Sequence, residues 1–202
     1  MNHRLNKIIL GLSGAAAIGL PVAAYGQESN NEIIVTARRV EERLQDVPIS
    51  ITVFNQQQIS ERNVVTASDL AIYTPSLSST PQFGADNASY AIRGFVQNAG
   101  TAPTVGVYFA DVVAPRAPTG TSQAGDGAGP GFLFDLQNTQ VLKGPQGTLQ
   151  GRNTTGGAII FMPQKPTWNL EGYVEGSYGN LDMTRLQGAI NIPLGDKARF
   201  RI

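Results

Sequence analysis

Apolar and polar side chains alternate in three consecutive runs over residues 171–202, and turns rich in Gly, Asn, Asp and Pro separate the runs. Val174, Leu186 and Ile190 belong to the apolar set. Such alternation predicts β-strands. Strands with one apolar and one largely polar face are typical of a transmembrane β-barrel, although an antiparallel sheet with one wet face alternates in the same way. Because the third run stops at Ile202 without a turn, the pattern also predicts that the chain is a fragment.

Residues 47–166 have the mixed pattern of a compact domain. In chain order the pattern predicts a strand over 49–53, helices over 57–62 and 66–73, strands over 90–95 and 105–109, and a short helix over 134–142 that leads into a strand. Thr66 and Asp69 have the spacing of a capping box, which supports the second helix. A long loop rich in Pro, Gly, Ala and Thr covers 115–131. Loops of that length are uncommon inside compact domains unless they serve a function.

The N-terminus has the layout of a secretory signal peptide over residues 1–26. Arg4 and Lys7 precede an uncharged run over 8–24, and small residues at Ala24-Tyr25-Gly26 fit a cleavage site. The run contains Pro21 and falls short of the ~20 apolar residues that a spanning helix needs, which disfavours a membrane anchor.

After a short polar stretch, residues 33–37 form an isolated β-prone patch, Ile33-Ile34-Val35-Thr36-Ala37, and a charged run follows it. This patch, called the box segment below, is too short to build a core with its sequence neighbours. It is either a stray edge strand or an extended segment that adds to the sheet of a partner protein.

Composition narrows the function classes. The chain has 15 basic and 15 acidic residues, and this balance excludes a strongly basic nucleic-acid binder. It has no Cys, and its single histidine, His3, lies in the predicted signal peptide. The mature protein would therefore lack thiolate and imidazole chemistry, both for catalysis and for metal binding. Because no constellation of Ser, Asp and Lys stands out either, the sequence predicts neither an enzyme nor a resident metal or cofactor.

The most specific motif is glycine-rich and covers residues 143–157, called the glycine signature below. It lacks the GxxxxGK[ST] pattern of a phosphate-binding loop. Its glycines therefore predict tight turns and close backbone packing, so that the motif is a structural spine and not a phosphate site. The positions concerned are Lys143, Gly144, Pro145, Gly147, Gly151, Arg152, Gly156 and Gly157.

Five features occur in a fixed order: the signal peptide, the box segment, the Ile92-Arg93-Gly94 motif, the glycine signature and the alternating strands. In this order they resemble the N-terminal part of a TonB-dependent outer-membrane receptor. The sequence departs from the family pattern at three places, which comprise four residues. Lys143 stands where Arg is common, Gln150 stands where Tyr is common, and Ala110-Asp111 replaces the usual Asp-Gly.

The resemblance implies the fold class. Residues 46–166 would be an α+β plug domain with a small mixed β-sheet and short helices, and 167–202 would be the first antiparallel strands of a transmembrane β-barrel of about 22 strands. Residues 27–45 would be a periplasmic segment that carries the TonB box, Ile33 to Ala37.

The resemblance also implies the function, which is energised uptake of a scarce ligand, most often a ferric siderophore. The protein would contact outer-membrane lipid and no nucleic acid, and the box segment would pair as a strand with a TonB-like periplasmic partner. Cobalamin, other metal chelates and oligosaccharides stay open as ligands, and a soluble periplasmic binding module stays open as a rival class.

The resemblance further implies roles for two groups of residues. Arg93 and Arg152 match plug arginines that pair with acidic residues of the barrel. Apical loops would face the ligand; these are the loop around Gln82, Phe83 and Gly84 and the long loop over 115–131, which contains Arg116.

Overall fold

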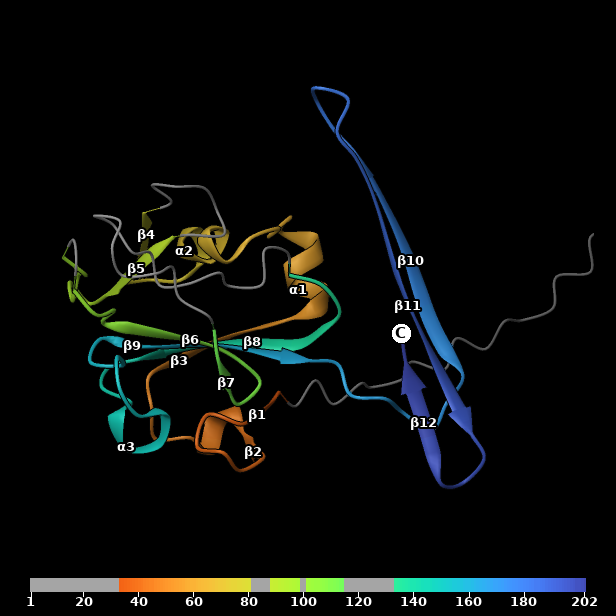
Figure 1. Cartoon of the computed structure of the whole chain (residues 1–202), viewed down its shortest axis with the longest axis horizontal. Helices are drawn as coiled ribbons and strands as arrows, with labels where there is room; N and C mark the ends of the chain where they lie inside the picture. The colour runs from red at the N-terminus through yellow and green to blue at the C-terminus, as the bar shows by residue number, and fades with distance from the viewer. Residues whose placement is uncertain (1–32, 81–87, 99–100, 115–132) are drawn as a thin grey trace, which may run out of the picture. The chain divides into compact units, whose positions relative to one another are not determined.

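The computed structural model describes residues 33–80, 88–98, 101–114 and 133–202 (Figure 1). Its centre is a five-stranded sheet in the order β3-β8-β9-β6-β7. β6 and β9 pair in parallel and the other neighbours pair antiparallel, which confirms the predicted mixed sheet. The strands are β3 (Ile51–Asn55), β6 (Val105–Phe109), β7 (Val112–Val113), β8 (Leu136–Lys143) and β9 (Gly157–Pro163).

Short helices begin where the sequence offers caps. Asn55 and Gln58 form a reciprocal capping box at the start of α1 (Gln56–Glu61). Thr66 and Asp69 form the predicted second capping box, but the helix behind it is a 3₁₀ turn (Ala67–Asp69) followed by α2 (Leu70–Tyr73). α2 ends before Thr74, as expected because Thr74 precedes Pro75 and a residue before proline disfavours the helical conformation.

Two smaller pairs of strands accompany the sheet. β4 (Leu77–Thr80) pairs with β5 (Ser89–Ile92), and β1 (Ile34–Val35) pairs with β2 (Glu42–Arg43), which a 3₁₀ turn (Leu44–Asp46) follows. The predicted strand over 90–95 stops at Ile92, because Arg93 and Gly94 have positive φ angles of 54° and 80° and turn the chain.

Apolar side chains are buried on both faces of the five-stranded sheet. One cluster includes Phe54, Leu70 and Phe161 and lies under α1 and α2. The other cluster includes Val35 and Leu142 and forms where the β1–β2 hairpin covers the opposite face. The hairpin is therefore part of the packed domain.

The short helix predicted within residues 134–142 is wrong, because Leu136–Lys143 form β8, whereas the strand that the helix was predicted to lead into is present. β8 lies between β3 and β9 and pairs with both along most of its length. A strand buried on both faces lacks the simple alternation that identifies a half-exposed strand, so its local sequence does not separate it from a short helix.

The C-terminal residues form an antiparallel sheet of β10 (Glu171–Tyr178), β11 (Thr184–Leu194) and β12 (Ala198–Arg201). This confirms the three predicted strands. Val174 and Leu186 of the apolar set are about 80% exposed, at 80% and 77%. None of the described residues forms a helix that is long and apolar enough to cross a membrane.

A single ion pair joins β12 to the residue that precedes β8. Arg201 Nε and Nη2 donate to Asp135 Oδ2 and Oδ1 at 2.7 and 2.5 Å. Both side chains are largely buried, with 11% and 16% of their surface exposed. The signal peptide predicted over 1–26 lies outside the described residues.

Candidate functional site

The glycine signature folds back on itself through its own backbone. Gly144 N donates to Gly156 O at 2.9 Å, and Gln146 N donates to Thr154 O at 3.0 Å. The short helix α3 (Gly147–Gln150) lies between these bonds. Gly151 follows α3 with a φ of +84°, a conformation that favours glycine. This arrangement supports the prediction of a structural spine.

The Ile92-Arg93-Gly94 motif lies against the glycine signature. A Cβ added at Gly144 would be 3.3 Å from Arg93 Nη1, and a Cβ added at Gly157 would be 2.7 Å from Ile92 Cδ1. The two motifs are some fifty residues apart in the chain, and their close approach depends on glycine at these positions.

Two cations meet at this contact. Burial lowers the pKa of Lys143, and the positive charge of Arg93 lowers it further. Both effects disfavour the charged form of the lysine. A carboxylate beside these two side chains would offset both effects, and this is the chemistry that the family resemblance assigns to acidic residues of the barrel for Arg93.

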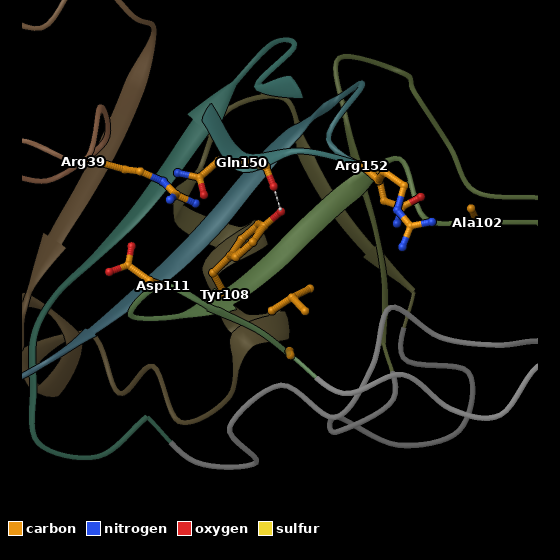
Figure 2. Close-up of a pocket in the computed structure, with 9 residues that line it drawn as sticks. Arg39, Ala102, Tyr108, Asp111, Gln150 and Arg152 are labelled. Atoms are coloured by element: carbon orange, nitrogen blue, oxygen red, sulfur yellow. Dashed lines mark hydrogen bonds between the residues drawn. The ribbon is translucent and has the colours of Figure 1, made fainter. Parts of the chain in front are cut away.

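A cavity of about 730 Å³ lies beside the glycine signature (Figure 2). Arg39, which follows the box segment, and Arg152 of the glycine signature both line it. Between them Tyr108 Oη donates to the backbone oxygen of Gln150 at 2.8 Å, and Asp111 adds a carboxylate to the wall. Gln150 and Asp111, two of the four residues at which the sequence departs from the family pattern, therefore line the cavity.

The box segment is docked on the plug. Val35 and Ala37 are 0% and 1% exposed and belong to the cluster that contains Leu142 and Ile160. The patch was expected to form no core with its sequence neighbours, but it does contribute to a core. Most of the other buried residues of this cluster are distant in sequence and come from β6, β8 and β9. The patch forms an edge strand, β1, of a two-stranded sheet in which β2 is its partner.

Sequence analysis missed Asn138 and Gln140, two buried residues of β8 that contact the box segment. Asn138 Nδ2 donates to Ile34 O at 3.2 Å, and Gln140 Nε2 donates to Thr36 Oγ1 at 3.3 Å. Gln140 Nε2 also donates to Asn138 Oδ1 at 2.8 Å. The sequence did contain a signal for these residues, because two amides at alternate positions lie on the same face of a strand. The prediction of a helix in this region meant that the signal was not recognised.

The predicted ligand-facing residues Gln82, Phe83, Gly84 and Arg116 lie outside the described residues. The same is true of the loop over 115–131. Their role stays a prediction.

We expect the protein to bind no free metal ion. In the described ranges no group of three or more His, Cys, Asp or Glu side chains could hold one. Titration calorimetry of the chain with ferric or zinc salts should show no specific heat of binding. Tight, stoichiometric uptake of either ion would contradict the prediction.

Known proteins resemble the chain in sequence and in fold. The pesticin receptor of Yersinia pestis is 28% identical over 190 residues, which are 93% of this chain and 27% of that protein. The crystal structure of the ferric yersiniabactin uptake receptor from Yersinia pestis matches with a TM-score of 0.61 and 26% identity, over 73% of this chain and 22% of that one. The structure of the ferripyoverdine receptor of Pseudomonas aeruginosa with ferripyoverdine bound matches in fold with a TM-score of 0.68 and 24% identity. This match covers 86% of this chain and 22% of that one.

This chain thus spans about a quarter of the length of these receptors. A family model, the TonB-dependent receptor plug domain, matches residues 43–158. That match covers more than half of the chain, including the whole five-stranded sheet except the last five residues of β9. The chain therefore belongs to the family of TonB-dependent receptor plug domains.

Proposed function

We propose that this chain is the plug-bearing N-terminal part of an outer-membrane receptor that imports a ferric siderophore with energy from a TonB-like partner. The observation that carries the proposal is the plug fold followed directly by strands that expose an apolar face. The names of two similar proteins support the ligand class, since one takes up ferric yersiniabactin and the other binds ferripyoverdine.

The proposed division of labour follows the chain. Residues 1–26 direct export, 27–45 reach the periplasm with the box segment, 46–166 form the plug, and 167–202 begin the barrel. The side chains of β10 and β11 support the last assignment, because a soluble module would not leave Val174 and Leu186 so exposed.

A receptor of this design needs work from outside its own membrane. The outer membrane has neither an ion gradient nor ATP, so energy has to arrive mechanically through a periplasmic partner. Strand addition suits this task, because it couples two proteins through backbone hydrogen bonds. In this proposal a pull on the box segment rearranges the plug and opens a path for the ligand.

The box segment should bind the periplasmic domain of the TonB-like partner as an isolated peptide. A peptide of residues 27–43 is titrated with that domain in a calorimeter. The same peptide with Ile34→Pro should lose binding, because proline removes a backbone donor from the added strand. A peptide with Gln27→Ala, outside the box segment, is the matched control and should bind like the parent. If the parent peptide does not bind, the proposed coupling is wrong.

A further inference from the structure

We propose that the side-chain amides of Asn138 and Gln140 cover the pairing edge of the box segment, so that a partner strand can add only after these amides let go. The inference rests on the proposed function, because it concerns the availability of the strand that the partner would bind. It concerns two residues of the central sheet to which neither the family resemblance nor the comparisons give a role.

β2 pairs with only one edge of β1. Leu44 N donates to Ile33 O at 2.9 Å, in the register that also pairs Ile34 with Arg43. Along an antiparallel strand, the backbone groups of successive residues point to opposite edges. The N–H and C=O of Ile34 therefore point away from β2, toward the second edge of β1.

A side-chain amide of β8 binds the backbone at this second edge. Asn138 Nδ2 donates to Ile34 O, the acceptor that an added strand would use. Gln140 Nε2 reaches Thr36, the next residue whose backbone would face the added strand, through its Oγ1. Asn138 is 5% exposed and Gln140 is fully buried, so a partner strand cannot pass beside them. β2 thus occupies one edge of the box segment, and on the other edge the Asn138 amide holds the backbone acceptor of Ile34 while Gln140 holds the Thr36 side chain.

The two amides bind each other at a shorter distance than they bind the box segment. Their bonds to the box segment are 3.2 and 3.3 Å long, whereas the bond between the two amides is 2.8 Å. Gln140 Oε1 is buried without a hydrogen-bond partner. When the box segment leaves, the amides keep the bond to each other, and water gains access to Gln140 Oε1, which lowers the cost of release. The amides therefore set the register of docking and block addition, while apolar burial of Val35 and Ala37 supplies most of the hold.

Release can be measured without a partner, since the chain has no native cysteine. A Val35→Cys variant of the whole chain places a thiol where exposure is 0%. Its reaction with a maleimide then reports the fraction of molecules in which the box segment is released. Adding Asn138→Ala removes the bond to Ile34 and should raise the labelling rate about five- to tenfold. Adding Gln137→Ala, at an exposed neighbour on the same strand, should leave the rate unchanged.

A second thiol reports on folding. Ala67→Cys lies in the apolar cluster on the opposite face of the sheet, 3% exposed, and its labelling should stay slow with Asn138→Ala. If the thiols at positions 35 and 67 both become reactive, the plug has unfolded. The experiment is then repeated with Asn138→Ser in place of Asn138→Ala, because serine keeps a small polar group that cannot reach Ile34. A rate at position 35 that neither substitution raises, in a folded plug, overturns the proposal.

Partner binding separates this inference from the proposed function. The periplasmic domain of the TonB-like partner should bind the whole chain about five- to tenfold more tightly with Asn138→Ala, because more molecules are binding-competent. Its affinity for the 27–43 peptide serves as the reference. If Asn138→Ala speeds labelling at position 35 but the partner domain does not bind the peptide, the amides do cover the box segment and the proposed coupling to this partner is wrong. If the partner domain binds the peptide, but Asn138→Ala changes neither the labelling rate at position 35 nor the affinity of the whole chain, the proposed role of the amides is wrong and the proposed coupling is supported.

Discussion

Replacing Gly157 with valine is expected to unfold the plug. A Cβ at this position would lie 2.3 Å from Leu142 O and 2.7 Å from Ile92 Cδ1. The oxygen belongs to the backbone of β8 in the middle of the sheet, so it cannot move aside as the end of a flexible side chain would. We expect a loss of at least about 3 kcal/mol in the free energy of unfolding, at the upper end for overpacked positions. Urea denaturation of the whole chain measures it.

The matched control is Gly147→Ala in the same glycine signature. Gly147 begins α3, and a Cβ there would have no heavy atom within 4 Å, so the variant should unfold like the parent. The stability of Gly151→Val should fall between those of Gly157→Val and Gly147→Ala. Its surroundings are also open, but its φ of +84° strains any residue with a side chain and should cost on the order of 1 kcal/mol or more. Equal stability of the Gly157 and Gly147 variants would contradict the close packing of the signature.

Breaking the Asp135–Arg201 pair is expected to free β12 from the plug. Both groups are largely buried, so removing one leaves the other charge without a partner and away from water. We expect Asp135→Asn and Arg201→Gln each to lower the local stability of β12 by about 2 kcal/mol, which corresponds to a roughly thirtyfold faster amide exchange. Hydrogen exchange of the whole chain in detergent measures this at residues 198–201.

A double-mutant cycle tests whether the two groups act on each other. The double variant should exchange no faster than the slower of the single variants, because neither charge is then left alone. Exchange in β8 and β9 should stay slow in all three. If the double variant exchanges faster by the sum of the two single effects on the free energy of opening, the ion pair does not stabilise β12.

The sequence predicted those elements whose signal is local. The alternation of residues 171–202 gave β10, β11 and β12, because each has one exposed face, and the spacing of Thr66 and Asp69 gave the second capping box. β8 was missed because apolar clusters bury both of its faces, and the residues that cover these faces are distant in sequence.

The same limit explains what the sequence missed in the candidate site. The box segment is recognisable as an isolated β-prone patch, but its docking depends on Asn138 and Gln140, which lie 104 residues further along the chain from the residues they contact. The contact between Arg93 and Gly144 is likewise set by the sheet and not by either motif alone. Sequence reasoning can name such motifs, whereas only the tertiary structure shows that they meet.

The hairpin made by β1 and β2 also decides how a mechanical load would act on the plug. Residues 33 and 44 lie side by side at its open end, since Leu44 N bonds to Ile33 O. A tension applied at the N-terminus pulls these two ends apart and loads the ladder bonds one after another, from the open end toward the turn at 36–40. A hairpin unzipped in this way yields at a lower force than strands sheared along their length, where all bonds share the load. The hairpin ladder has two paired positions and that of β8 and β9 has seven, so the same tension would open the hairpin before it disrupts the central sheet.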